Sequence, residues 1–295
     1  MAEQVSSLLV FGSINQDIVL RVPEFPEPGQ TLKALSTSRA TGGKGANQAA
    51  AAALQGTTTR MIGAVGNDPG GSEARSALEA AGVDTSPLLV SDGAATGTAY
   101  INVRGDGENT IVVEPGANAV LSGKTADSVF ADARWALLSL EVPETEAMEF
   151  ATRAQRHGVQ VALNASPSLT GPLPQGLVDL LIVNEGEISS LAGSAWEQIE
   201  DLPTAVGVES VVVTRGGAGV DLFQRGVPVQ HVPADAVRVV DTTGCGDAFA
   251  GVMMAALTRG AGYQEALRQA TSYAGRAAEH PGAMSAYFLI SERDA

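Results

Sequence analysis

Short apolar runs recur along the whole chain and are separated by segments in which apolar residues return every three or four positions. The runs, rich in Leu, Val and Ile, predict buried strands over residues 7–14, 61–65, 135–140, 159–164, 178–183 and 210–214. The segments between and after them predict helices over 45–54, 68–81, 144–157, 185–192, 195–206, 246–258 and 263–279. Strands that alternate with helices predict an α/β fold: a Rossmann-like parallel sheet with helices on both faces.

Two segments break this alternation. Residues 17–39 and 96–113 alternate apolar and polar positions around Pro-Gly or Gly-Asp-Gly turns, which is typical of half-exposed antiparallel hairpins. Because both leave the α/β body directly after strands, we expect them to combine into a small inserted β-sheet that acts as a lid. The alternatives are that the same sheet is a dimerisation surface and that the two segments are unrelated surface excursions. We expect a single α/β domain over residues 1–295, although the length alone also allows two domains.

Composition and charge narrow the possible partners. Lys and Arg number 18 against 33 Asp and Glu, a net charge of −15, which disfavours nucleic acid as a partner. One cysteine excludes an internal disulfide framework. No run reaches the roughly 18 apolar residues of a membrane span, and the N-terminus lacks the basic start of a signal peptide. We therefore expect a cytoplasmic protein with no membrane partner.

The segment VVDTTGCGDAFAGVMM, residues 239–254, carries the strongest chemical signal. A strand ends at Asp241, and the small-residue loop 243–246 opens onto a helix that begins near Asp247. Free amides and the helix dipole at such a start favour an anion. A carboxylate at the same point could take the proton of a hydroxyl that attacks a phosphoryl group. The alternative is that Asp247 only caps the helix.

The segment GGKGANQ, residues 42–48, is a second glycine-rich start of a helix. It is not a Walker A loop, because Gly45 follows Lys44 where Ser or Thr should stand. The glycines bring the backbone close to a ligand, and Lys44 and Asn47 can donate hydrogen bonds. Asn15 and Asp17 follow the first strand, at the rim where α/β proteins bind ligands. A solvated lysine and ordinary turn chemistry are the alternatives.

Three further strand ends carry polar groups. Glu141 follows one strand, Asn184 ends another with Glu187 three residues later, and residues 214–219 read TRGGAG. Asn184 and Glu187 could hold a hydrated magnesium ion, which prefers oxygen ligands. A helix N-cap with a capping-box Glu is an alternative that is compatible with the magnesium site.

Cys245 stands at a helix start, where its thiol pKa should fall. No histidine is near it in the sequence, which disfavours a nucleophilic cysteine. A serine hydrolase is also disfavoured, because the chain has no G-x-S-x-G elbow.

Taken together, FGSINQD, FPEPGQT, GGKGANQ, LLSLE, LLIVNEGE, VVVTRGGAG and DTTGCGDAFAG resemble the ribokinase family of PfkB-type carbohydrate kinases. They do so in the family's order and over nearly the whole chain. The resemblance implies a Rossmann-like body, a β lid that pairs with the lid of a second subunit in a homodimer, and ATP-dependent phosphorylation of a sugar hydroxymethyl group. The first and third segments favour D-ribose, with D-ribose 5-phosphate as product. A nucleoside kinase, another sugar kinase of the family and a non-catalytic sugar-binding regulator are the alternatives.

The resemblance also implies roles for individual residues. Asp247 matches the catalytic base, and the anion hole is matched by Gly244, Cys245 and Gly246. The sugar-binding positions, with Asp247, are matched by Asn15, Asp17, Gly43, Lys44, Asn47 and Glu141. Glu187 lies near magnesium, and the nucleotide positions are matched by Asn184, Thr214, Gly216, Gly219, Gly246 and Thr271. A potassium ion would be held, partly by backbone carbonyls, by Asp241, Thr243, Ala277, His280, Gly282 and Ser285.

The chain departs from the family pattern at two places. The loop 243–246 reads TGCG where the family usually has small alanines. The loop that contains HPGAMSAY is one residue short, and we expect the last helix usual in this family to be missing after it.

Overall fold

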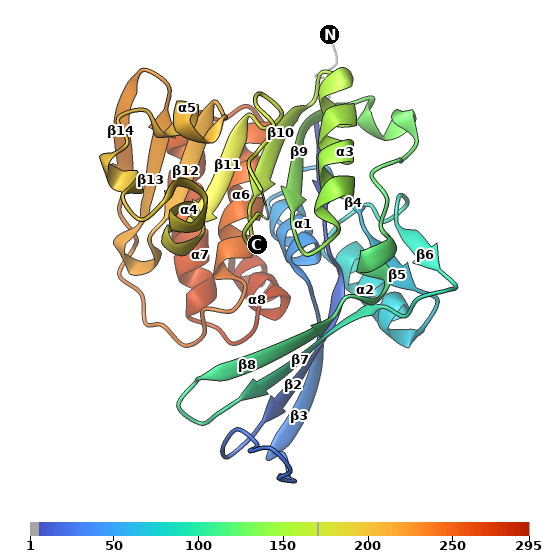
Figure 1. The fold of residues 1–295 in the computed structure, drawn as a ribbon. Helices are drawn as coiled ribbons and strands as arrows, with labels where there is room; N and C mark the ends of the chain where they lie inside the picture. The colour runs from blue at the N-terminus through green and yellow to red at the C-terminus, as the bar shows by residue number, and fades with distance from the viewer. Residues whose placement is uncertain (1–5, 170, 295) are drawn as a thin grey trace.

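An eight-stranded sheet forms the centre of the computed structural model, which describes residues 6–169 and 171–294 (Figure 1). Residues 1–5, at the N-terminus where no signal peptide is expected, lie outside the described residues. The strand order is β14-β13-β12-β11-β10-β9-β1-β4, and the strands from β12 to β4 are parallel. Their bounds are β1 Ser7–Phe11, β4 Thr59–Ile62, β9 Ala133–Ser139, β10 Gln160–Asn164, β11 Leu180–Asn184, β12 Ser210–Thr214, β13 Val220–Gln224 and β14 Val227–Val232.

Helices cover both faces of this sheet. Successive residues of β1 point to opposite faces, so that Leu8 and Val10 join one apolar core and Leu9 and Phe11 join the other. One core contains α1 Lys44–Ala53, α2 Pro69–Ala80, α6 Cys245–Thr258, α7 Tyr263–Ala278 and α8 Met284–Asp294, and the other contains α3 Glu144–Arg156, α4 Glu185–Ala192 and α5 Leu202–Val206. The predicted fold class is therefore confirmed. No helix in the described ranges is long and apolar enough to cross a membrane.

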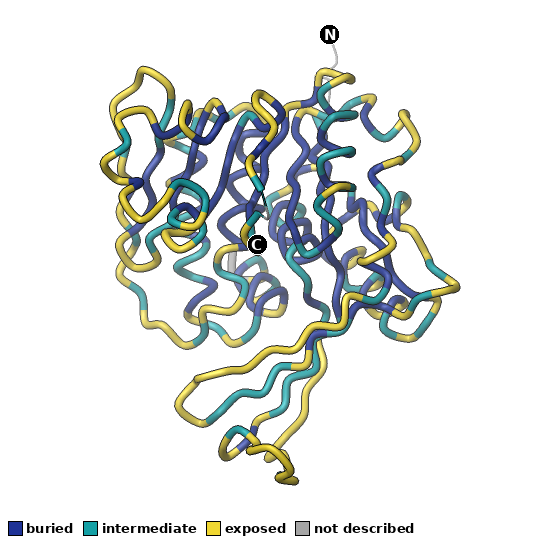
Figure 2. The backbone as a smooth tube through the Cα atoms, viewed as in Figure 1, coloured by how far each residue is buried: buried dark blue, intermediate teal, exposed yellow. Residues whose placement is uncertain are grey.

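A second, four-stranded sheet, here called the lid sheet, projects from the body (Figure 1). Its order is β3-β2-β7-β8, with bounds β2 Asn15–Arg21, β3 Ser36–Gly42, β7 Gly97–Val103 and β8 Asn109–Glu114. Each hairpin is antiparallel, and the two hairpins join through a parallel pairing of β2 with β7. The two segments that break the sequence pattern thus form one sheet, as predicted. Figure 2 shows that most of it is exposed or half-buried.

Several short elements were predicted differently. The run 61–65 is divided at Gly63 between β4 and β5 Ala64–Gly66, which pairs with β6 Leu89–Ser91. The predicted helix 195–206 is wrong as one helix: it consists of the 3-10 turn η3 Trp196–Gln198 and the short α5. Pro203 cannot continue a preceding helix, and α5 starts afresh with Asp201 as its N-cap. The remaining 3-10 turns are η1 Gly116–Val120, η2 Asp127–Phe130 and η4 Gly216–Ala218.

Two elements at the C-terminal half were missed. β13 and β14 add an antiparallel hairpin to the edge of the parallel sheet. The prediction that the last helix is missing is wrong, because α8 covers Met284–Asp294. Its buried residues Ala286, Tyr287 and Ile290 recur at helical spacing and pack in the same core as α1 and α7. The same spacing of apolar residues is visible in the sequence and indicates this helix.

Candidate active site

The loop before α6 has a defined shape because α8 holds it. Gly244 is the N-cap of α6 with φ of 73°, a conformation that favours glycine. A Cβ at this position would lie 2.4 Å from Cβ of Ala283. The buried hydroxyl of Tyr287 donates a hydrogen bond to the Gly244 carbonyl at 2.6 Å. Tyr287 was not among the predicted site residues, because the helix that carries it was not predicted.

One backbone amide of the predicted anion hole already has a hydrogen-bond partner within the loop. The Cys245 amide donates to the Thr242 carbonyl at 3.2 Å. Burial raises the pKa of the Cys245 thiol to about 11, and the carboxylates of Asp241 and Asp247 act in the same direction. The sequence-based expectation of a lowered thiol pKa is therefore wrong, since desolvation and two nearby carboxylates disfavour the thiolate here.

Asp247 lies in the first turn of α6 and is only 7% exposed. Its Oδ2 accepts a hydrogen bond from Nδ2 of Asn47 at 3.2 Å, and Nζ of Lys44 is 3.9 Å from its Oδ1. Burial raises the pKa of Asp247, while Lys44 and the amide donors oppose that rise. A buried carboxylate beside a cation is suited to accepting a proton. The structure thus brings the two glycine-rich segments together around the Asp247 carboxylate.

Gln48 also contacts Asp247, and the sequence analysis did not single it out. Its Nε2 donates to Oδ1 of Asp247 at 3.0 Å and to Oδ1 of Asn164 at 2.9 Å. A polar residue in an Ala-rich helix was the available signal, but the sequence alone does not tell which face of α1 it occupies.

Asp17 lies on β2 of the lid sheet and is near Glu141 and Asp247. A Cβ at Gly42 on the neighbouring strand would lie 2.1 Å from Oδ2 of Asp17, so only glycine leaves room for this carboxyl. Burial, together with the charges of Glu141 and Asp247, raises the pKa of Asp17 from 3.8 to about 7. Asp17 therefore changes charge near neutral pH.

Glu141 and Asn15 are fixed by neighbours from distant segments. Oε2 of Glu141 accepts from the hydroxyl of Ser13 at 2.6 Å and from the Lys44 amide at 3.2 Å. Oδ1 of Asn15 accepts from Nδ2 of Asn118 at 2.8 Å. Gly43, with φ of 91°, is the N-cap of α1 between these groups. The structure thus brings the predicted sugar-binding residues together around the starts of α1 and α6, and adds Asn118 as a partner that was not predicted.

The residues predicted to contact a nucleotide are more dispersed. Asn184 and Glu187 form a capping box at the start of α4, in which each side chain accepts from the other's amide at 2.8 Å. The alternative interpretation of this pair as a helix cap is therefore confirmed, and it leaves the second Glu187 oxygen outside the box. Thr214 ends β12, directly opposite Asn184 on β11, and Gly216 and Gly219 follow it with φ of 53° and 100°.

Thr271 lies on α7, where it lines a cavity of about 450 Å³ with β14 residues. Its hydroxyl is buried and has no hydrogen-bond partner among the described residues. Such a polar atom lacks the hydrogen-bond partner that buried polar groups usually have.

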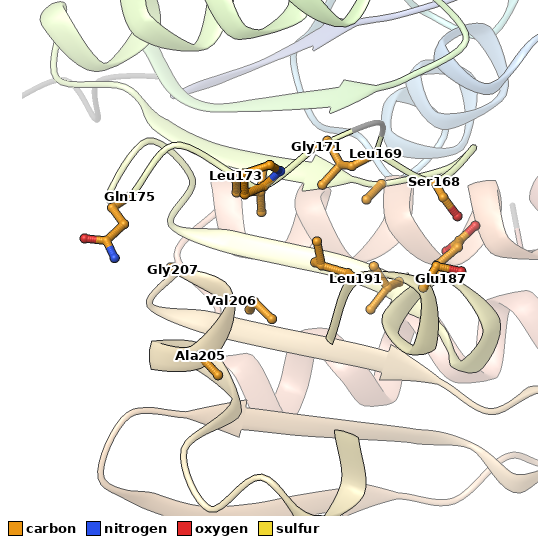
Figure 3. A pocket seen from close by; sticks show the side chains of 14 residues that line it. Ser168, Leu169, Gly171, Leu173, Gln175, Glu187, Leu191, Ala205, Val206 and Gly207 are labelled. Atoms are coloured by element: carbon orange, nitrogen blue, oxygen red, sulfur yellow. The ribbon is translucent and has the colours of Figure 1, made fainter. Parts of the chain in front are cut away.

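A larger cavity of about 460 Å³ lies between the loop that follows β10 and the helices α4 and α5 (Figure 3). Glu187 and Ser168 lie at one end of it and Gln175 at the other (Figure 3). It contains Glu187 but none of the other predicted site residues. It flanks the core opposite α6, so it is not the place where Asp247 acts.

The residues predicted to hold potassium surround the loops before α6 and α8. The carboxylate of Asp241 accepts from the amide and hydroxyl of Thr243 at 2.9 and 2.7 Å, and from the Gly282 amide at 2.8 Å. These hydrogen bonds lower its pKa, although burial acts in the opposite direction. His280 donates its amide to the Ala277 carbonyl, and Ser285 already lies in α8.

Four of these six residues, but not Ala277 or His280, border a cavity of about 380 Å³ between the lid sheet and the loops before α6 and α8. Asp17 lines its lid side and Asp241, Thr243, Gly282 and Ser285 line its body side. No cluster of three or more His, Cys, Asp or Glu side chains suited to a metal ion occurs in the part of the chain that the structure describes. Carbonyl and hydroxyl oxygens would therefore have to supply most ligands of a cation here.

The arrangement places a buried carboxylate beside an ammonium group and near polar residues of the lid sheet, which is suited to accepting the proton of a hydroxyl group. The sequence pattern of the pfkB family of carbohydrate kinases matches residues 5–287. The chain belongs to this family, and it is a phosphotransferase with an alcohol group as acceptor.

Three comparisons illustrate the relationship. The chain is 34% identical to a ribokinase from Haemophilus influenzae, over 95% of this chain and 94% of that protein. It is 31% identical to a deoxyribokinase from Salmonella typhimurium, over 97% and 96% of the two chains. The structure of Arabidopsis thaliana ribokinase complexed with ribose and ATP superposes with a TM-score of 0.87 at 29% identity, and covers 98% of this chain and 99% of that one.

Proposed function

We propose that this enzyme transfers the γ-phosphoryl group of ATP to the primary hydroxyl of D-ribose, giving D-ribose 5-phosphate and ADP. The observation that carries the proposal is the buried Asp247 carboxylate, which lies at the start of α6 beside Lys44 and Asn47. The similarity to ribokinases, one of them complexed with ribose and ATP, supports the choice of both substrates.

The reaction follows from the position of this carboxylate. As the sugar hydroxyl oxygen attacks the γ-phosphorus in line, its proton passes to Asp247, and the bond to the bridging oxygen of ADP breaks. The ammonium group of Lys44 and the amides of residues 244–246 offset the negative charge that develops on the transferred group. The Cys245 amide must exchange its bond to Thr242 for one to the phosphoryl oxygen.

The sugar would lie between the lid sheet and α1. Asp17 and Glu141 accept from its hydroxyls, Asn15, Lys44 and Asn47 donate, and Gly43 lets the ring approach the backbone. Oδ1 of Asn47 is buried without a partner among the described residues, and a sugar hydroxyl can supply that missing donor. A free sugar presents more hydroxyls per volume than a nucleoside, which favours ribose over the nucleoside alternative.

The nucleotide would contact Asn184, Thr214, Gly216, Gly219, Gly246 and Thr271. Glu187 fits a magnesium ion, because one carboxylate oxygen remains outside the capping box and magnesium prefers oxygen ligands and water. The ion would neutralise phosphate charge when it is bound with ATP. Asn184 keeps the Glu187 side chain in one orientation.

Potassium is the proposed activator. Asp241, Thr243, Gly282 and Ser285 border one cavity, and the carbonyls of Ala277 and His280 belong to the adjoining end of α7 and the loop after it. One carboxylate with neutral oxygens suits a large monovalent cation better than magnesium. Potassium should raise kcat or lower the KM for ribose, and Asp241→Ala should abolish that response. Equal activity in potassium and tetramethylammonium buffers of matched ionic strength would contradict the proposal.

We also propose that residues 1–295 act as one domain and that the lid sheet, formed by about 17–39 and 96–113, pairs with the lid of a second subunit. The exposed apolar side chains of β8 support this. A cytoplasmic location stays a prediction of the sequence.

The decisive experiment is a coupled ADP-release assay of the wild-type enzyme and Asp247→Asn. The wild type should prefer ribose over deoxyribose, fructose and adenosine. The variant should lose about 10²–10⁴-fold in kcat and keep its affinity for ribose. A variant with near-normal kcat would reduce Asp247 to a helix cap, and a preference for adenosine would favour the nucleoside kinase. Absence of turnover with every acceptor would favour the sugar-binding regulator.

A further inference from the structure

Gln48 is the one fully buried amide side chain that touches the proposed base in the described part of the chain. It lies on α1, is 0% exposed and donates from Nε2 to Oδ1 of Asp247 at 3.0 Å. Because none of its surface is exposed, it has no direct access to a sugar bound between the lid sheet and α1. Any effect on the reaction must therefore pass through the carboxylate.

The orientation of the Gln48 amide follows from the backbone of β11. The Ile182 carbonyl can only accept, so Asn164 must turn Nδ2 toward it, and these atoms are 3.1 Å apart. This leaves Oδ1 of Asn164 facing Gln48, which must then present N–H groups to both Asn164 and Asp247. The sheet thus determines which end of the Gln48 amide faces the base.

The arrangement holds both oxygens of the carboxylate. Oδ2 of Asp247 accepts from Asn47 and Oδ1 accepts from Gln48, two consecutive residues of α1. Two donors at fixed positions restrict rotation of the carboxylate about its own axis. Asn47 can also turn toward the sugar, whereas Gln48 cannot, since it is completely enclosed.

Packing alone does not explain a glutamine at this place. Oε1 of Gln48 is buried and has no hydrogen-bond partner among the described residues. An unpaired buried acceptor is unfavourable, so the two hydrogen bonds that Nε2 donates, to Asn164 and to Asp247, must offset its cost. Methionine or leucine at this place could donate neither bond.

We propose that Gln48, oriented by Asn164 and the Ile182 carbonyl, is a positioning residue that fixes the Asp247 carboxylate for attack of the sugar hydroxyl. This inference rests on the proposed role of Asp247 as the base. Other groups also influence the charge of Asp247: Lys44 on α1 favours its ionised form, while burial and Glu141 oppose it. The remaining titratable groups that interact with it are Asp17, Cys245 and Tyr287.

The test replaces Gln48 with methionine, which keeps the volume and removes the donor. We expect kcat to fall about tenfold, the loss of one hydrogen bond to a charged group. The KM for ribose should stay within about twofold of the wild type, because the residue has no direct access to the sugar. In the pH profile of kcat, the acid limb should move to higher pH by about one unit, since the lost donor favoured the ionised form of Asp247.

Two further variants keep the test informative. Gln48→Glu preserves the shape and places a like charge beside Asp247, so the acid limb should move further in the same direction. Asn164→Ala removes only the residue that orients Gln48 and should give a smaller shift of the same sign. Leu78→Ala, at a fully buried site on α2, is the control for lost stability and should leave the acid limb unchanged.

The outcomes separate this inference from the proposed function. If Asp247→Asn is inactive and Gln48→Met keeps the wild-type kcat and acid limb, the positioning role is overturned and the base remains. A lower kcat with an unmoved acid limb, as in Leu78→Ala, also overturns it. If Asp247→Asn retains activity, the proposed function itself fails.

Discussion

The central sheet and the lid sheet differ in how far their apolar side chains are buried. All five residues of β1 are buried, and Val10 is 0% exposed between the two helical layers. All six residues of β8 are exposed, and Val112 is 66% exposed (Figure 2). The body is thus stabilised by its own core, whereas the lid sheet leaves apolar side chains in solvent. The difference places Asp247, the proposed base, in the packed body, and Asp17, which we propose binds the sugar, on a sheet whose apolar side chains face solvent.

The largest effect should come from a matched pair of Val→Ala substitutions. Val10→Ala removes two methyl groups from a closely packed site and should lower the free energy of unfolding by about 2–3 kcal/mol. Val112→Ala should change it by less than about 0.5 kcal/mol, as at other exposed positions. Urea denaturation at a low protein concentration measures both. Equal costs at the two positions would mean that the lid sheet is as well packed as the body.

The next effect concerns assembly. Ile111 and Val113 lie on one face of β8, and Val112 with its partner Tyr100 lies on the other. Replacing either pair with lysine should weaken a lid-mediated dimer at least about tenfold, because two charges would need desolvation. Light scattering should show a mass near 30.1 kDa for the pair that lies in the interface. Dimers in both variants would exclude the lid sheet as the interface.

Asp17 should couple the lid sheet to pH. Its pKa of about 7 means that the carboxylate forms mainly above neutrality, so the KM for ribose should fall between pH 6 and 8. Asp17→Asn should raise KM about tenfold at pH 8 and remove this dependence. A variant with the wild-type pH profile would assign the titration to another group.

The same pKa predicts the sign of a stability change. Because the folded-state pKa is raised from 3.8 to about 7, the native state holds an extra proton between these values. Asp17 therefore destabilises the native state increasingly as pH rises through this window, and fully above it. Asp17→Asn should raise Tm at pH 8 and leave it almost unchanged below pH 4.

The smallest effect should come from the contact between α8 and the loop before α6. Tyr287→Phe removes the hydroxyl that bonds the Gly244 carbonyl and should lower kcat only a few-fold, because Gly244 keeps its backbone conformation. Steady-state kinetics at saturating substrates would measure this. A loss as large as that of Asp247→Asn would mean that the hydroxyl takes part in the reaction.

Much of the body could be predicted from the sequence because its signals are local. The β-branched run that became β12 and the Asp68 cap that begins α2 each depend on a few neighbouring residues. The alternating hairpins of the lid sheet were predicted for the same reason. The parallel pairing of β2 with β7, by contrast, joins segments about 80 positions apart, and no local pattern encodes that register.

The motifs of the candidate site could be predicted from the sequence, but the contacts between its residues could not. Glycine-rich segments, which are easily recognised in a sequence, contain Asp247, Lys44 and Asn47. Gln48 and Tyr287 act from within helices, where their roles depend on which face is turned inward. The raised pKa of Asp17 arises from burial and from charges on other segments. Both depend on the three-dimensional structure, so this pKa could not be predicted from the sequence.

The hydrogen bond between Asn47 and Asp247 joins residues 200 positions apart. Closing so long a loop is unfavourable until the strands and helices between its ends have formed, and contacts of this kind slow folding. Asp247, the proposed base, therefore reaches its final position only when most of the chain has been organised. During refolding, activity should return after the circular dichroism of the helices has recovered, which makes turnover a sensitive reporter of the final ordering step.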